Sequence, residues 1–406
     1  MKVLDKEKNS IIEEKHINEF KQNDDEIKIN KKRDISIDLI RVIACLTVIG
    51  THLCLQVLNQ CYNRIDWSRL LEKSFLTDGV PLFFMITGFF LVNGRSYKKI
   101  WKSTALKILL PSFLFVIFTQ VFYPFIVNQE SFMWCIKNFN INTLGVVQSI
   151  LKADVKYLNP TCAHLWYIYS YVKIVIWIPV LWLVCKETKE SKLARKIMIG
   201  LSILNIVLVD IQRFVTIPNI GAINILSLIP TEILYVLLGY ELFVHKDKIK
   251  NNKKICIISL MGYIGINLLR YKIEMQYMVL NYLTDIVGRE NFMEWRYTSI
   301  NIISGLFLFM FLYSFEIKNR RLNNIILWIS NKTFGIYLVH YLILAKIDLY
   351  KFEKIEKFIF ELAYLAIGLI LTLILSIVIV VILENIKKAI VKCIKFLKIK
   401  LLVENR

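Results

Sequence analysis

Residues 34–58 read DISIDLIRVIACLTVIGTHLCLQVL. About 20 mostly apolar residues are enough for a helix to cross the hydrocarbon core of a bilayer, so this stretch predicts a membrane-spanning helix. The helix would carry three ionisable side chains, Asp38, Arg41 and His52. Such groups are costly inside a membrane, and where they occur they usually face the protein interior or a wet cavity and mark function. This helix therefore holds the first candidate site residues of the chain.

Two of these side chains share one helix face. Arg41 and His52 are eleven residues apart, which at about 100° per residue is three full turns plus about 20°. Their Cα atoms are then separated by about 16 Å along the helix axis. Asp38 precedes Arg41 by three residues, a spacing that lets the carboxylate and the guanidinium pair. The sequence thus predicts a charge pair near one membrane surface and an imidazole deeper on the same face.

The composition is that of a membrane protein. Hydrophobic residues make up 56% of the 406 residues, and the mean hydropathy is +0.51, which is too apolar for an ordinary soluble domain. The net charge of +20 could suggest nucleic acid, but the basic residues gather in loops between apolar segments, so we expect no nucleic-acid partner. The eight cysteines show no C-x-x-C and no other ligand spacing, so we expect no metal site.

Ten apolar segments predict an all-α, polytopic membrane fold. We expect a charged cytoplasmic tail at 1–33, a ten-helix membrane domain at 34–385 and a basic, amphipathic tail at 386–406. Basic residues concentrate in alternate loops, so the positive-inside rule places both termini in the cytoplasm. The larger outer loops are expected at about 128–164 and 271–297. The predicted spans are about 36–58, 76–94, 104–127, 165–185, 197–216, 223–244, 254–270, 298–316, 324–346 and 359–383.

Five motifs resemble those of the acyltransferase type 3 family, over about residues 34–385. The first is the D-L-I-R of 38–41 followed by His52, which is similar to the first helix of that family. The remaining four motifs follow in the family's order: FFMITG at 83–88, HLWY at 164–167 with Pro179, LGY at 238–240 and TFGIYLVH at 333–340. Within FFMITG, Thr87 departs from the family, which usually has serine at that position.

The resemblance implies an integral-membrane enzyme that moves an acyl group from a cytoplasmic acyl-coenzyme A to a cell-surface molecule. We expect O-acetylation of an envelope polysaccharide or lipid-linked glycan, with acetyl-coenzyme A as donor and no bound cofactor, in a bacterial plasma membrane. It also implies that His52 is essential and that Arg41 belongs to the donor site. Two other function classes fit the same residues: a glycan or lipid carrier (flippase) that uses them as a proton or phosphate site, and a ligand-sensing membrane module without catalysis.

The chemistry of such a transfer suits an imidazole. His52 could take the proton of the acceptor hydroxyl as a general base, or carry the acyl group itself as a nucleophile. Arg41 could hold a phosphate of coenzyme A through two parallel hydrogen bonds, with Asp38 beside it. A structural interpretation competes with each role. Arg41 could snorkel to the membrane surface while paired to Asp38, and His52 could be a hydrogen-bonded packing residue.

Further donor-site candidates lie in and after the second predicted span. Thr87 could line the donor site, or together with Gly88 it could allow two helices to pack closely. Lys98 and Lys99 could bind coenzyme A phosphates, although the positive-inside rule accounts for both without a ligand.

Trp166, Glu232 and His340 are the acceptor-site candidates. Trp166 opens the fourth span at the outer side, where aromatic anchors are expected in any case. Glu232 lies near the middle of the sixth span, where a carboxylate is costly, so it either pairs structurally or binds the acceptor. His340 lies on the ninth span, either as a second polar group of the cavity or as a packed interior histidine.

Overall fold

The structure, a computed structural model, describes residues 33–58, 67–91, 96–126, 129–137, 160–214, 229–283, 295, 297–346 and 358–404. The chain divides into a short N-terminal unit, Met1–Ile35, and a second unit, Ser36–Arg406. Apart from Arg33, the predicted cytoplasmic tail lies outside the described residues. Every described element is a helix, which confirms the all-α prediction.

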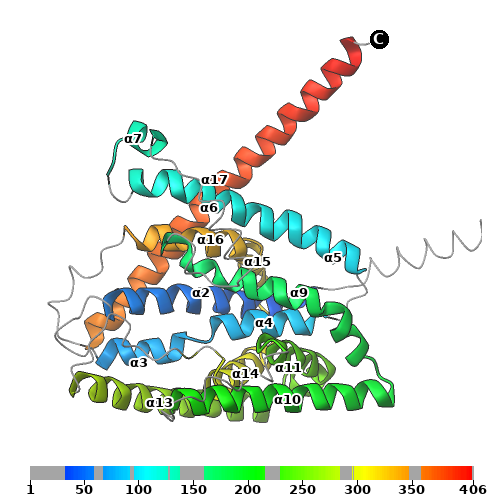
Figure 1. The fold of residues 1–406 in the computed structure, drawn as a ribbon, viewed down its shortest axis with the longest axis vertical. Helices are drawn as coiled ribbons and strands as arrows, with labels where there is room; N and C mark the ends of the chain where they lie inside the picture. Colours follow the sequence, from blue (N-terminus) through cyan, green and yellow to red (C-terminus); the bar gives the residue numbers. More distant parts are fainter. Residues whose placement is uncertain are drawn as a thin grey trace, which may run out of the picture. The chain divides into compact units, whose positions relative to one another are not determined.

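The first predicted span is helix α2 (Ile35–Leu58), which runs through the middle of the second unit (Figure 1). On one side it packs against the junction of α3 (Trp67–Leu76) and α4 (Gly79–Phe89). There the Thr51 hydroxyl donates to the carbonyl oxygen of Leu76 at 2.5 Å. Gly79 is needed at this junction, because a Cβ would lie only 2.5 Å from the carbonyl oxygen of Ala44. The other side of α2 faces α16 (Thr333–Leu344).

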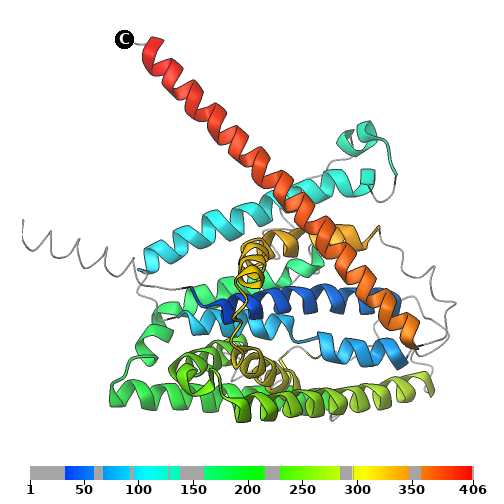
Figure 2. The ribbon, with the colours of Figure 1, turned by 180° about the vertical axis from the view of Figure 1, so that it is seen from behind.

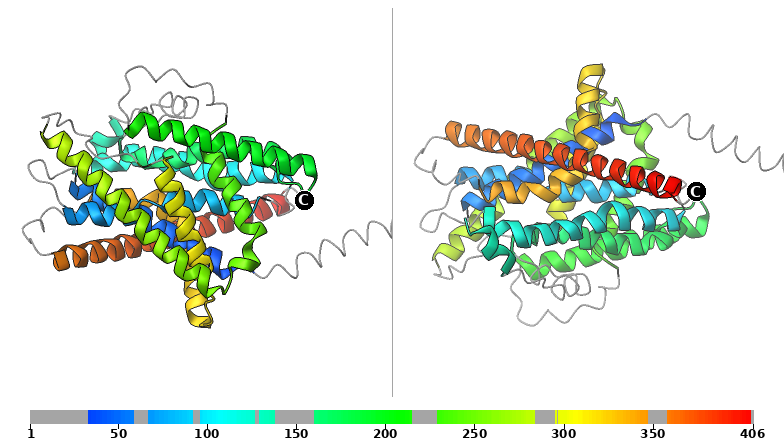
Figure 3. Two further views of the ribbon diagram at one scale, coloured as in Figure 1. Left: turned by 90° about the horizontal axis from the view of Figure 1, so that it is seen from below. Right: turned by 90° about the horizontal axis from the view of Figure 1, so that it is seen from above.

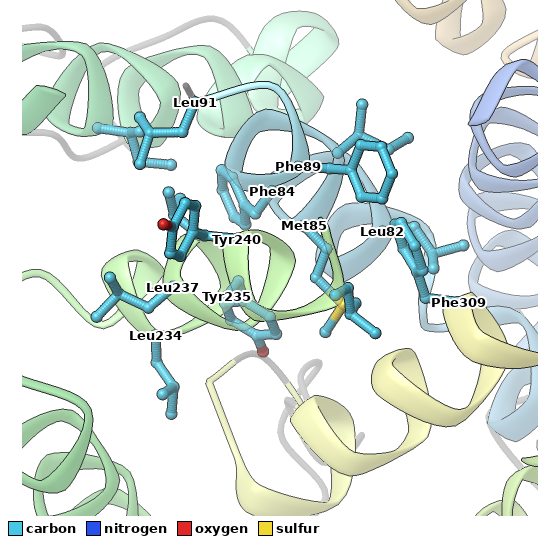
Figure 4. Close-up of a cluster of buried hydrophobic side chains, with 14 of the residues drawn as sticks. Leu82, Phe84, Met85, Phe89, Leu91, Leu234, Tyr235, Leu237, Tyr240 and Phe309 are labelled. Atoms are coloured by element: carbon cyan, nitrogen blue, oxygen red, sulfur yellow. The ribbon is translucent and has the colours of Figure 1, made fainter. Parts of the chain in front are cut away.

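Helices α4 and α11 (Glu232–Val244) pack in the core with their backbones in close contact. Gly88 of α4 lies against the backbone of Val236, and Gly239 of α11 lies against the backbone of Met85, so a Cβ on either glycine would overlap a carbonyl oxygen. Small residues allow such an approach between helices in membranes. Figure 4 shows the surrounding side chains of α4, α11 and α14 meeting in one apolar cluster. The packing role considered for the Thr87–Gly88 pair is therefore met by Gly88.

The structure corrects one predicted outer loop. We expected 271–297 to be a loop, yet α13 (Lys253–Leu283) continues through its first part. Arg270, at the predicted end of the seventh span, and Glu274, just beyond it, are fully buried in ion pairs with Asp78 and Lys73, respectively. Helix α14 (Ser299–Tyr313) crosses and packs against α13 (Figure 3). Pairing inside the protein, not solvent, is what satisfies these charges.

The predicted ninth span, 324–346, is wrong as a single helix. It is divided into α15 (Arg320–Ser330) and α16, with a turn at Asn331 and Lys332. Serine and asparagine compete with helical hydrogen bonding through their side chains, and the Ser330 hydroxyl bonds to Asp38 of α2 at 2.6 Å. The break thus coincides with a tertiary contact at the end of α15.

The outer helices present apolar side chains at the surface. A continuous helical segment is built from α5 (Tyr97–Thr104), the π-helix η1 (Ala105–Leu109) and α6 (Leu110–Ile126). Others are α9 (Trp166–Val184), α10 (Lys189–Phe214) and α17 (Phe358–Glu404), which packs against α16 (Figure 2). Large exposed apolar side chains on these helices, such as Leu114, Ile203 and Ile370, fit contact with lipid. Short helices complete the fold: α7 (Phe132–Lys137), η3 (Pro160–Leu165) and α12 (Lys246–Ile249).

Fewer than ten helices of the described ranges are long and apolar enough to cross a membrane singly. Five helical segments within the described ranges are long and apolar enough to cross a bilayer. Helices α4, α11, α14 and α16 have 11, 13, 15 and 12 residues, below the roughly 17–25 that a single crossing needs. They lie within the predicted second, sixth, eighth and ninth spans. The described structure therefore does not confirm the count of ten.

Candidate functional site

His52 lies near the C-terminal end of α2, beside α16. Its ring centroid is 5.4 Å from that of His340 and 5.5 Å from that of Tyr341, which it meets edge-on. Helix α2 brings His52 there because its apolar residues pack on both sides, with Ile49 and Leu53 fully buried. The structure thus brings together two residues that the sequence assigned separately, His52 to catalysis and His340 to the acceptor.

The hydrogen bonding of His340 fixes which ring nitrogen carries a proton. Its Nδ1 lies 2.7 Å from the carbonyl oxygen of Tyr337, one turn earlier in α16. A carbonyl only accepts, so Nδ1 donates and a neutral ring leaves Nε2 with its lone pair. His340 is fully buried, and Nε2 has no hydrogen-bond partner among the described residues. Because buried polar atoms normally have a partner, this nitrogen is available to a proton or a ligand.

A third imidazole completes the group that we call the histidine cluster: His52, His164 and His340. His164 stacks on Tyr341, with centroids 5.1 Å apart, and lies 5.2 Å from His340. Two hydrogen bonds hold His164 in place. Its Nε2 donates to the carbonyl oxygen of Leu338 at 3.2 Å, and the Tyr337 hydroxyl donates to the backbone carbonyl oxygen of His164. In the described part of the chain, no group of three or more histidine, cysteine or acidic side chains is arranged to hold a metal ion.

The predicted charge pair lies nearer the start of α2. Arg41 Nη1 donates to Asp38 Oδ1 at 2.8 Å and to the Ser330 hydroxyl at 3.1 Å, and Ser330 donates to the same carboxylate at 2.6 Å. Asp38 is buried, whereas the Arg41 side chain is 26% exposed. The buried carboxylate and hydroxyl therefore orient an arginine whose side chain is still partly exposed. Ser330 gave no signal in the sequence, because its part depends on the break before α16.

The other donor candidates are more dispersed. The Thr87 hydroxyl donates to the carbonyl oxygen of Phe83 in its own helix at 3.0 Å. Lys98 and Lys99 are exposed on α5, where Ser96 caps the helix by accepting from the Lys99 amide. Trp166, an acceptor candidate, begins α9 directly after η3 and is half-buried, two residues from His164.

Glu232 is not in the middle of a span as predicted but is the first residue of α11. The helix dipole favours a carboxylate at this position. The Glu232 side chain is only 2% exposed and accepts a hydrogen bond from Tyr297. The sequence predicted a mid-span position for Glu232 because residues 223–228 are mostly apolar, like the start of a longer helix. Residues 223–228 lie outside the described residues.

Comparison with known proteins identifies the family. A family model described as "Acyltransferase domain" (Acyl_transf_3) matches residues 34–381. The chain belongs to this acyltransferase family. The match begins at α2 and includes the histidine cluster, the Arg41 group and Glu232, so all of these lie in the acyltransferase domain. Searches of the curated proteins and of the solved structures found no match.

The family match and the apolar helices make the chain a multi-pass membrane acyltransferase. Four of its site residues come from three family-like motifs that are far apart in the sequence: Arg41 and His52, His164, and His340. The fold joins these motifs near one helix, α2, along which the Cα atoms of Arg41 and His52 are about 16 Å apart.

Proposed function

We propose that this acyltransferase transfers an acetyl group from acetyl-coenzyme A to a hydroxyl of an envelope polysaccharide or lipid-linked glycan. The proposed location is the plasma membrane of a bacterium. The observation that carries the proposal is the position of His52 in the histidine cluster, on the same helix as an accessible Arg41. Arg41 would hold a phosphate of coenzyme A, and the pantetheine arm would follow α2 to bring the thioester to His52.

Two chemical routes fit this arrangement. In the first, His52 takes the proton of the acceptor hydroxyl, the oxygen forms a bond to the thioester carbonyl carbon, the C–S bond breaks, and the proton goes to the leaving thiolate. In the second, His52 itself attacks that carbon, the C–S bond breaks, and the imidazole N–H proton goes to the leaving thiolate; the acceptor oxygen then takes the acetyl group and its hydroxyl proton returns to the imidazole. His340, with an open Nε2, would hold the proton of His52 until the thiolate takes it. An acetyl group trapped on histidine in the absence of acceptor is expected only for the second.

The test is transfer by the purified full chain in lipid nanodiscs. The assay measures thiol release from radiolabelled acetyl-coenzyme A and label in an envelope glycan fraction. Wild-type protein should do both, whereas His52→Ala and His52→Gln should do neither while inserting and purifying normally. His245→Gln changes an exposed histidine at the end of α11 and should behave like wild type. A folded His52→Ala protein with wild-type transfer would refute the catalytic role, and a wild type that releases no thiol would favour the carrier interpretation.

We also propose that both termini and the α9–α10 connection face the cytoplasm, on the evidence of the loop charges. A membrane-impermeant thiol reagent should label Asn140→Cys strongly in intact cells and should not label Ser191→Cys. The opposite pattern would reverse the proposed orientation.

A further inference from the structure

A second polar cluster lies where α9, α11 and the residues before α14 meet. We call it the α9–α11 cluster: Ser170, Lys173, Glu232 and Tyr297. The Tyr297 hydroxyl donates to Glu232 Oε1 at 2.9 Å and lies 3.2 Å from the Ser170 hydroxyl. Lys173 Nζ lies 3.6 Å from the same carboxylate oxygen. Lys173 and Tyr297, from two separate parts of the chain, therefore converge on the buried carboxylate of Glu232, and Ser170 contacts the Tyr297 hydroxyl beside it.

Lys173 is the strongest sign that this cluster binds something. It is the only charged residue of α9, which is long and apolar enough to cross the membrane. Its side chain is nevertheless 41% exposed. A charged group within a membrane span usually faces a water-filled cavity or a substrate path. The cluster is thus reachable from outside the protein core.

Tyr297 supports the same interpretation. Its φ angle is 61°, a left-handed conformation that is uncommon for a bulky residue and costs on the order of 1–3 kcal/mol. The next residue, Thr298, caps α14 by accepting from the Asn301 amide, so the strained residue is fixed by the helix start behind it. Backbone strain of this kind is concentrated at binding and catalytic sites, and here it aims a phenol at Glu232.

The chemistry of the cluster indicates what it would bind. The ammonium of Lys173 and the carboxylate of Glu232 balance each other in charge, so the site does not select a charged ligand. It offers hydrogen-bond donors and acceptors side by side, which matches sugar hydroxyls, because each of them both donates and accepts. Tyr167 and Tyr171 of α9, whose ring centroids are 6.4 Å apart, are both half-buried and offer aromatic faces in the adjacent turns of the helix.

We propose that the α9–α11 cluster binds a neutral sugar unit of the acceptor glycan. That this sugar belongs to the acceptor rests on the proposed function. Tyr167 links the cluster to the histidines, because its ring contacts that of Tyr337 at 5.9 Å, and Tyr337 holds His164. From Tyr167 to Lys173 the rise along α9 is about 9 Å. The cluster therefore holds the acceptor at a distance from the histidines and does not take part in the transfer.

Saturation-transfer NMR on the full chain in nanodiscs tests this binding directly, with methyl β-D-glucopyranoside as the probe. Wild-type protein should transfer magnetisation to the sugar ring protons. Lys173→Met and Tyr297→Phe should each weaken binding by about tenfold, because each removes one hydrogen bond from the site that binds the sugar. Lys192→Met is the matched control, because Lys192 forms an exposed pair with Glu187 at 2.9 Å and should leave the signal unchanged.

Three results would overturn the proposal: no signal with wild type, an unchanged signal in folded Lys173→Met and Tyr297→Phe proteins, or a stronger signal from methyl glucuronide than from the neutral glucoside. Binding does not require turnover, so the two hypotheses fail separately. A protein that binds the glucoside in the predicted way but moves no acetyl group would refute only the proposed function. One that transfers acetyl groups with unchanged sugar binding in the variants would refute only this site.

Discussion

The imidazole rings of His52 and His340 lie 5.4 Å apart between centroids, on helices from opposite ends of the chain. At this distance the two rings are direct neighbours. The Nδ1 hydrogen bond to Tyr337 orients His340 as a neutral base. In the proposed transfer the pair would act as one unit, with His52 at the reacting atoms and His340 behind it.

We predict that His340→Gln lowers kcat about 10²-fold, within the usual range for a lost acid–base group, with little change in the KM for acetyl-coenzyme A. Steady-state thiol release, with the exposed His245→Gln as control, measures the effect. An unchanged kcat in folded His340→Gln protein would show that His340 is a packing residue.

We predict that Arg41→Lys weakens binding of coenzyme A about tenfold, because lysine keeps the charge but loses the planar fork that binds phosphate through two bonds. Isothermal titration of the purified protein with coenzyme A measures the change. Arg321→Lys is the control, since Arg321 is exposed on α15 and should not alter affinity.

Asp38→Asn separates the two roles considered for the charge pair. The buried carboxylate accepts from both Arg41 and Ser330, so its loss should let the guanidinium move and should weaken coenzyme A binding. Tighter binding in Asp38→Asn would mean that Asp38 competes with the phosphate for Arg41. Unchanged affinity in both Arg41→Lys and Arg41→Ala would return Arg41 to a snorkelling role.

Much of the first helix could be predicted from the sequence, because its features are local. The apolar length of 34–58, the i, i+3 pair of Asp38 and Arg41, and the shared face of Arg41 and His52 all follow from helix geometry. The contact of His52 with His340 could not be predicted, since no local rule fixes which helices pack together. The same holds for Ser330, whose hydroxyl reaches Asp38 only because the chain breaks after α15.

The predicted end of the seventh span, at about residue 270, was wrong along α13. Arg270 and Glu274 lie there, and Asp78, before α4, and Lys73 of α3 neutralise them inside the fold. The sequence cannot show such partners, because Asp78 and Lys73 lie 192 and 201 residues away from them. The same limitation applies to Glu232, whose contact with Lys173 and Tyr297 depends on three separate elements.

We predict that Gly88→Ala prevents normal folding, because its Cβ would overlap the carbonyl oxygen of Val236 and force α4 and α11 apart. Overpacking usually costs about 1–3 kcal/mol, and here the obstacle is backbone, which cannot rotate away. Gly200→Ala is the matched control: nothing lies within 4 Å of its added Cβ on α10. Fluorescence-detected gel filtration should show a loss of monodisperse protein and a lower Tm for Gly88→Ala alone. Equal behaviour of the two variants would contradict the close packing of α4 and α11.

We predict that Asp78→Ala is strongly destabilising. The Asp78 carboxylate is fully buried and accepts from Arg270 at 2.9 Å, Asn301 at 3.0 Å and Ser304 at 2.6 Å. Its removal leaves the Arg270 guanidinium buried without its counter-charge, which typically costs about 3–5 kcal/mol. Asp247→Ala is the control, because Asp247 is exposed on α12 and should change stability by no more than about 0.5 kcal/mol.

The double variant Asp78→Ala/Arg270→Met tests the physical cause. If the cost comes from an uncompensated buried charge, removing that charge as well should recover part of the stability, since apolar replacement of a buried ion pair is often close to neutral. Thermal unfolding of the purified proteins should then rank wild type first, the double variant second and Asp78→Ala last. A double variant less stable than Asp78→Ala would show that Arg270 stabilises the fold through its bonds to Ser74 and Asn267, independently of the ion pair.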